Sequence, residues 1–223
     1  MKQPVMIPFD YSFSVDDSEM KKRSEVFFNL LSKRRTIRDF SDKPVPAEVI
    51  LNCIKTAGTA PSGANKQPWH FVAVSDRLVK RKIRIAAEEE EHQFYTHRAP
   101  KEWLEALSPI GTDEKKPFLE KAPWLIAIFS KSYDLNENSK KIKNYYTTES
   151  TGIACGMLIT ALHNCGLVSL THTPSPMNFL NEILSRPANE KPFLLLVTGY
   201  PAENATVPDL RRKELKEFVT VLE

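Results

Sequence analysis

The chain has 223 residues, of which 41% are hydrophobic and 26% charged, and its formal net charge is +3. This composition is typical of a globular protein with one sizeable core, and so small a charge gives no reason to expect nucleic acid as a partner. Since no run approaches the roughly 20 apolar residues of a transmembrane helix, and no signal peptide is visible at the start, we expect a cytoplasmic protein with no membrane partner.

The first part of the chain is predicted to hold an arm and two helices. Residues 1–23 show no hydrophobic period, so we expect an amino-terminal arm ahead of one domain over 24–223. Ser24 is a candidate N-cap for a helix that continues to Arg34. Pro46 suits the first turn of a second helix. The apolar face of that helix carries Ile50, Cys53, Ile54 and Ala57, spaced i, i+3, i+4 and i+7.

The middle of the chain should contain a strand, a long helix and a long loop. Residues 70–75 form an apolar run that predicts a strand, and Asp76 is the expected N-cap of a helix that reaches about Tyr95. Residues 96–116 break the helical pattern, which predicts a long loop with one helical turn. Loops of this length within a compact domain are often functional, so we interpret 96–116 as a lid.

The carboxy-terminal half alternates strands with helices, which indicates an α/β or α+β layered domain. We expect strands at 124–129, 167–173 and 193–198, and helices at 145–165 and 177–185. The final apolar run, Phe218 to Leu222, follows a polar segment and has no hairpin partner beside it. An unpaired terminal strand leaves an exposed edge, so we expect this run to add to a sheet, either of this subunit or of a second one.

The cysteines and histidines predict no metal site. Cys53, Cys155 and Cys165 have no metal-ligand spacing, and each lies in an apolar helical context, so we expect buried thiols in a reducing compartment. The five histidines also form no constellation with metal-ligand spacing, and a core or surface position is expected for each.

Two short runs together indicate a cofactor that carries a phosphate. Arg34-Arg35-Thr36-Ile37-Arg38 places three guanidinium groups within five residues, and arginine binds phosphate with a rigid fork of donors. The loop from Ala60 to Pro68 is rich in small residues, which lets backbone N–H groups approach a flat ligand. Taken singly, each run also fits a solvated charge cluster or an ordinary turn.

With these two runs, the chain resembles the nitroreductase superfamily of FMN enzymes, and within it the iodotyrosine deiodinases. The likeness extends from about Lys33 to about Val221. Its specific part consists of Glu88-Glu89-Glu90-Glu91 with Tyr95, then Lys116, Thr171-His172-Thr173-Pro174 and the run from Ala205 to Lys213. The resemblance implies a central, mostly antiparallel sheet flanked by helices, and an intertwined homodimer with shared active sites. A C-terminal extension would reach the partner subunit.

The same resemblance implies FMN as the cofactor and assigns residues to it. The Thr173 hydroxyl would lie near N5 of the flavin as the catalytic group and favour one-electron chemistry, and Ser62 would lie against the flavin. The cofactor-binding residues implied are Arg34, Arg35, Thr36, Arg38, Pro61, Ser62, Gly63, Thr171, Thr173 and Arg212.

The residues themselves also suggest a site for a free amino acid. Glu91 and Tyr95 are four apart, so they share one face of a continuing helix. A carboxylate accepts from an ammonium, whereas the Tyr95 phenol and the Lys116 ammonium donate to a carboxylate. This trio matches a zwitterion, although a run of glutamates is also typical of a solvated face. The resemblance adds that the Ala64 backbone N–H would hold the phenolate oxygen of the substrate.

The function implied is reductive dehalogenation of halotyrosines, with 3-iodotyrosine converted to tyrosine and iodide by an FMN-dependent oxidoreductase that uses an unidentified electron donor. The alternative is a broad-range FMN nitroreductase or quinone reductase that uses NAD(P)H and does not need Glu91 or Lys116. A third possibility is a flavin-binding or flavin-destroying protein without a halotyrosine substrate.

Overall fold

The computed structural model describes residues 3–9 and 14–222, and the chain divides into two compact units, Met1–Arg34 and Arg35–Glu223. In the first unit, residues 3–9 have no helix or strand and α1 spans Asp17–Ser32. The Asp16 side chain caps α1 by accepting from the Glu19 N–H at 2.8 Å. The expectation of a helix start at Ser24 is therefore wrong. An aspartate cap followed by acidic residues in the first turn complements the helix dipole, and this fixes the earlier start.

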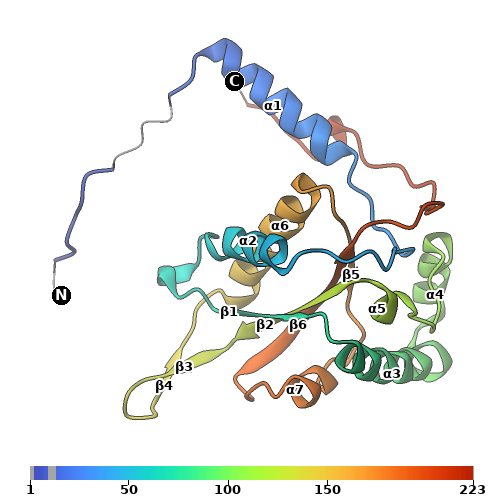
Figure 1. The fold of residues 1–223 in the computed structure, drawn as a ribbon. Helices are drawn as coiled ribbons and strands as arrows, with labels where there is room; N and C mark the ends of the chain where they lie inside the picture. The colour runs from blue at the N-terminus through green and yellow to red at the C-terminus, as the bar shows by residue number, and fades with distance from the viewer. Residues whose placement is uncertain (1–2, 10–13, 223) are drawn as a thin grey trace. The chain divides into compact units, whose positions relative to one another are not determined.

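The second unit is built on a four-stranded sheet, with strand order β1-β2-β6-β5. The strands are β1 (Trp69–Val74), β2 (Trp124–Lys131), β6 (Glu190–Gly199) and β5 (Val168–His172), and all three pairings are antiparallel. This confirms the predicted antiparallel sheet flanked by helices. Because β1 and β5 are the two edge strands, each offers one side for further contacts (Figure 1).

Helices cover both faces of this sheet, as Figure 1 shows, and the alternation of side chains along β2 explains why. Ile126 and Ile128 pack with α2 (Ala47–Gly58) and α6 (Thr147–Asn164). Leu125, Ala127 and Phe129 point to the other face, into a core shared with α3 (Arg77–Gln93), α5 (Phe118–Lys121) and α7 (Phe179–Ile183). Successive side chains of a strand point to opposite faces, so a strand buried on both sides is apolar throughout.

The segment predicted as a long loop is largely helical, which corrects that expectation. A single π-helical stretch, Phe94–Arg98, continues from α3, and α4 (Lys101–Leu107) and a 3₁₀ turn (Ser108–Ile110) follow it. Pro100 stands directly before α4, where its fixed φ angle suits a helix start, and Gly111 ends the turn at φ 66°. The proline and the glycine delimit the short helices and do not prevent them.

The carboxy-terminal segment adds to no sheet of its own subunit in the described structure, and its expected pairing with a second subunit stays a prediction. Phe218–Leu222 forms no strand in the described structure, and the only regular element nearby is a 3₁₀ turn at Leu215–Glu217. The Phe218, Val221 and Leu222 side chains are exposed.

A hairpin that the sequence did not predict joins β3 (Tyr133–Leu135) to β4 (Lys141–Lys143). The aspartate of β3 and the lysines of β4 break the apolar alternation that is typical of a half-buried strand.

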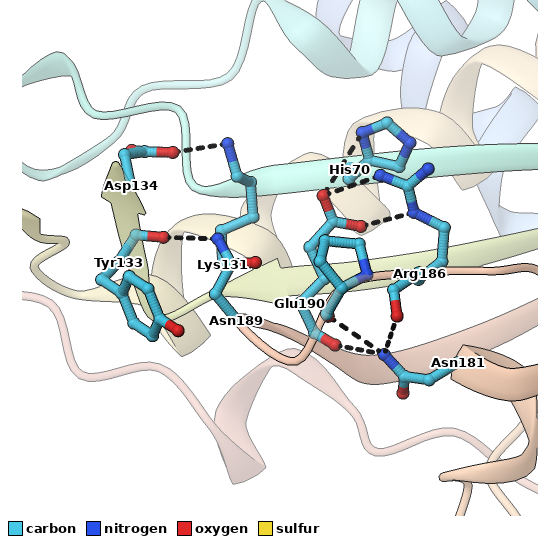
Figure 2. Close-up of polar contacts among 9 residues, drawn as sticks. His70, Lys131, Tyr133, Asp134, Asn181, Arg186, Asn189 and Glu190 are labelled. Carbon is cyan, nitrogen blue, oxygen red and sulfur yellow. Dashed lines mark hydrogen bonds and ion pairs between the residues drawn. The ribbon is translucent and has the colours of Figure 1, made fainter. Parts of the chain in front are cut away.

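A polar cluster fixes the start of β6 against its neighbours (Figure 2). The Glu190 carboxylate is buried and accepts two hydrogen bonds from the Arg186 guanidinium, at 2.7 and 2.9 Å, while His70 Nδ1 of β1 lies 3.8 Å from it. The Asn189 amide donates to the Tyr133 carbonyl at 2.7 Å. A buried charge needs such partners, so we interpret this cluster as structural.

Two of the three cysteines are buried as expected. Cys53 and Cys155 lie in the core between α2 and α6. Cys165 is exposed, which corrects the prediction for that residue, because it stands at the C-cap of α6, next to the exposed residues Asn164 and Gly166. No helix in the described ranges is long and apolar enough to cross a membrane.

Candidate active site

A cavity of about 230 Å³ lies where β5 meets α3 and the 94–116 segment. Six of the residues predicted for substrate or cofactor line it together: Arg38, Glu91, Tyr95, Lys116, Thr171 and Thr173. Phe94, Trp103 and Phe118 add aromatic walls. Ligand pockets for drug-sized molecules span roughly 300–1,000 Å³, so the cavity suits a ligand no larger than an amino acid.

An oppositely charged pair stands in this cavity. Glu91, in the last turns of α3, places Oε2 3.5 Å from Nζ of Lys116, and both side chains are largely buried. Lys116 follows the short helices of the 94–116 segment, and its ammonium also donates to Thr112 Oγ1 at 3.1 Å and to the Asp113 carbonyl. Its backbone N–H donates to Glu88 Oε1 at 2.8 Å, which ties the segment to α3.

Burial shifts the titration of Glu91, Lys116 and Tyr95 in the cavity. It raises the pKa of Glu91 and lowers the pKa of Lys116, and the attraction between the two charges opposes both shifts. Burial also raises the pKa of Tyr95, whose hydroxyl donates to the Thr112 carbonyl at 3.2 Å. Tyr95 therefore remains a neutral hydrogen-bond donor at neutral pH.

The arginine run reaches the cavity by pairing with the edge of the sheet. Thr36 forms a parallel bridge with Ser169 of β5, and the Ile37 N–H donates to the Ser169 carbonyl at 3.3 Å. With Ile37 buried, Arg38 lies beside Thr171 in the cavity lining. The Arg38 side chain is half-buried, burial lowers its pKa, and within the described ranges no carboxylate forms an ion pair with it.

The other predicted arginines lie outside this cavity lining. Arg35 donates from Nη2 to the Pro208 carbonyl, so it contacts the carboxy-terminal segment. Arg212 lies further along that segment, exposed and outside any helix or strand. Arg34 is the last residue of the first unit.

The small-residue loop is held in a strained shape at the other edge of the sheet. Ala64 and Asn65 have φ angles of 50° and 51°, and Ser62 Oγ accepts from the Gln67 N–H at 2.9 Å. A Cβ on Gly63 would lie 2.7 Å from Tyr146 Cδ2, which explains the glycine. Non-glycine residues at positive φ are uncommon, and such strain is typical of functional loops.

This loop and the cavity are not brought together within one chain. The loop leads into β1, whereas Thr171 and Thr173 belong to β5 and its end, and β2 and β6 lie between these edge strands. Three strand spacings separate the edges by about 14 Å. Figure 1 shows the loop, in teal, at the opposite end of the unit from α4. Pro61, Ser62, Gly63 and Ala64 therefore do not line the cavity formed by their own chain.

His172 is a cavity residue to which the sequence assigned no role beyond the core or surface. It is buried between the two threonines, and its Nδ1 lies 3.9 Å from Oε1 of Glu91. The sequence held one signal for the position of His172. Side chains alternate along a strand, so a residue between Thr171 and Thr173 lies on the face opposite to theirs. No group of three or more metal-ligating side chains occurs among the residues that the structure describes.

Known proteins resemble this chain in both sequence and fold. The model of the nitroreductase family matches residues 31–200. An iodotyrosine deiodinase of Haliscomenobacter hydrossis is 56% identical over 99% of this chain and 100% of that protein. The human iodotyrosine deiodinase 1 is 46% identical over 97% of this chain and 75% of that protein.

The comparison of structures agrees with the sequences. A crystal structure of oxidized iodotyrosine deiodinase bound to FMN and 3-iodo-L-tyrosine has a TM-score of 0.73 and 30% identity, and the match covers 87% of this chain and 100% of that one. An FMN-bound nitroreductase from Bacteroides fragilis shares the fold, with a TM-score of 0.63 at 19% identity, over 88% of this chain and 98% of that one.

Proposed function

Since the chain belongs to the nitroreductase family, we propose that it is an FMN-dependent oxidoreductase of the iodotyrosine deiodinase type, which converts halotyrosines to tyrosine and halide. The observation that carries the proposal is the Glu91–Lys116 pair, with Tyr95 beside it, in a cavity of amino-acid size. A general reductase of flat aromatic compounds has no need of two buried, opposite charges at this position.

The pair suits the backbone of a free amino acid. Glu91 accepts from the substrate ammonium, and Lys116 and Tyr95 donate to its carboxylate. Each charge-assisted hydrogen bond contributes about 1.5–3 kcal/mol where water is excluded. Residues Trp103, Leu107 and Ile110 line the same cavity, which supports a role for 96–116 as a lid whose closure removes water from the bound amino acid.

The residues at the edge of β5 fit FMN. Arg38 offers a half-buried guanidinium with no carboxylate partner in the described structure, and Thr171 and Thr173 expose their hydroxyls at that edge. Thr36 pairs with Ser169 of the same strand. We assign to the cofactor Arg38, Thr171, Thr173 and Thr36, together with Arg34, Arg35 and Arg212, which lie outside the cavity lining. We assign the Thr173 hydroxyl as the donor to the flavin ring. Bound FMN supplies the electrons that expel the halide.

A second copy of the chain would complete the site. The loop of Pro61, Ser62, Gly63 and Ala64 lies at the sheet edge opposite Thr173, so its N–H groups serve a cavity only across a dimer interface. In the described structure no hydrogen bond takes up the Ala64 N–H, which leaves it free to hold the phenolate oxygen of the substrate. We therefore propose a homodimer with shared active sites, supplied by an electron donor still to be identified.

The test is halide release. The FMN-loaded protein with dithionite and 3-iodo-L-tyrosine should yield iodide and tyrosine in equal amounts. Glu91→Gln and Lys116→Ala should each weaken binding of 3-iodo-L-tyrosine by about 10- to 100-fold, while the exposed neighbour variant Lys115→Ala binds like the wild type. Rapid reduction of a nitrophenol without iodide release, and without sensitivity to Glu91 or Lys116, would assign the chain to the general reductases instead.

A further inference from the structure

His172, the last residue of β5, lies between Thr173, which follows that strand, and Glu91 of α3. Along β5, Leu170 and His172 are buried on the face that packs against α5, whereas Thr171 and Thr173 are exposed. The imidazole meets the Phe118 ring edge to face, with the ring centroids 5.8 Å apart. His172 therefore points away from the threonines and toward the α3 side of the cavity.

The Glu91 carboxylate stands between two nitrogen groups. Oε2 lies 3.5 Å from Lys116 Nζ, and Oε1 lies 3.9 Å from His172 Nδ1. Both separations exceed the length of an ordinary hydrogen bond, about 2.7–3.2 Å, so both carboxylate oxygens of Glu91 can still accept hydrogen bonds. Contacts of this kind in ligand-free sites are often long and tighten when the ligand binds.

The imidazole is neutral at ordinary pH. Burial, with the nearby Lys116 ammonium as the second cause, lowers the pKa of His172 to about 3. A neutral imidazole has one donor and one acceptor. Glu91 and Lys116 are the charged groups that face it, and the acceptor oxygen of Glu91 favours the tautomer with the proton on Nδ1.

That tautomer leaves Nε2 as a buried acceptor, and Nε2 has no hydrogen-bond partner in the described structure. Buried polar atoms are nearly always paired, and an orphaned one costs stability. A leucine would fill the same space without an orphaned nitrogen. What the imidazole offers that leucine does not is a nitrogen that lies 3.9 Å from Glu91 Oε1 and can donate to it.

We propose that His172 is a positioning residue for the amino group of the substrate: its Nδ1–H holds the Glu91 carboxylate in the orientation that accepts from the ammonium. This inference rests on the proposed function, because it requires an amino acid in the cavity. The proposal adds His172 to the residues that bind the backbone of the amino acid, namely Glu91, Tyr95 and Lys116. Because His172 ends the strand that leads to Thr173, this one strand orients groups on both the cofactor side and the substrate side.

Three variants at this position separate a positioning role from packing. In His172→Asn the side-chain amide nitrogen can occupy the place of Nδ1, whereas His172→Gln places its amide near Nε2 and His172→Leu has no donor. The probes are 3-iodo-L-tyrosine and its analogue without the amino group, 3-(4-hydroxy-3-iodophenyl)propanoic acid. Their dissociation constants are measured by calorimetry with the FMN-loaded protein.

Leucine and glutamine should weaken binding of 3-iodo-L-tyrosine by about tenfold, a typical coupling between contacting groups, and asparagine should restore most of it. The analogue should bind all four proteins alike, and His172→Leu should add nothing in a Glu91→Gln background. Equal loss for both probes, or no loss for either, would overturn the inference even if the leucine variant folds poorly, because the glutamine variant keeps a polar side chain. If the wild type binds no 3-iodo-L-tyrosine, the proposed function fails, and this inference fails with it.

Discussion

Removing the cation of the buried pair tests the electrostatics of the cavity directly. In Lys116→Met, the Glu91 carboxylate loses its partner at 3.5 Å while its side chain stays 13% exposed. A buried charge left alone is costly, but the carboxyl escapes that cost by taking up a proton. The free energy of protonating Glu91 is therefore the largest loss of stability that the substitution can cause through this charge.

This largest loss follows from the pH and the ordinary pKa of glutamate, which is 4.5. At pH 7, protonation costs about 3.4 kcal/mol, since each pH unit corresponds to about 1.36 kcal/mol. We expect Lys116→Met to lower the free energy of unfolding by about 2–3 kcal/mol at pH 7 and by less than about 1 kcal/mol at pH 5. The sign follows from the raised pKa of Glu91: the penalty is absent below the ordinary pKa of 4.5, grows as the pH rises above that value, and is complete above the raised pKa of the folded state.

Urea unfolding at both pH values measures the effect, provided that the denaturant slope is unchanged. Lys115→Met is the matched control, because the Lys115 ammonium is exposed and lies 3.7 Å from Glu114, and removing it should change stability by less than about 0.5 kcal/mol. Adding Glu91→Gln to Lys116→Met should recover most of the loss. A loss that is the same at pH 5 and pH 7, or strictly additive effects in the double variant, would refute the reasoning.

Three further predictions concern other parts of the molecule. Gly63→Ala should destabilise the protein by about 1–3 kcal/mol in urea unfolding, because its Cβ would lie 2.7 Å from Tyr146 Cδ2; Gly58→Ala, with open space around the new Cβ, should change stability by less than about 1 kcal/mol. A thiol reagent should modify Cys165 alone in the folded protein, since burial raises the pKa of Cys155 to about 12, and burial together with the neighbouring Cys165 thiol raises that of Cys53 to about 12; fast reaction of a second thiol would contradict this. Because the folded pKa of His172 is about 3, below its ordinary 6.5, only the unfolded chain gains a proton there as the pH falls from 6.5 to 3. The wild type should therefore lose about 2–3 kcal/mol more than His172→Asn between pH 7 and pH 4.5, and parallel pH profiles of stability would count against it.

Local physics made much of the fold predictable. Asp76 caps α3 as expected, accepting from the Val79 N–H at 2.8 Å, and Ile50, Cys53 and Ala57 form the buried face of α2. Caps and hydrophobic periods act within a few residues, so they are visible in a sequence. The errors arose where two signals competed. Asp16, not Ser24, caps the first helix. The prolines and the glycine of 96–116 mark the ends of short helices instead of forming a loop.

The sequence by itself determined which chemistry is present: the spacing of Glu91 and Tyr95 on one helical face, the lysine downstream, the arginine run and the threonines at the end of a strand. Only the tertiary structure decided which of these groups meet. The strand order places Thr173 and the Ala64 loop at opposite edges of the sheet, and the pairing of Thr36 with Ser169 brings Arg38 to the cavity. The tertiary structure also places His172 beside Glu91. Such proximities depend on strand order and on packing between residues distant in the chain, and no local pattern encodes them.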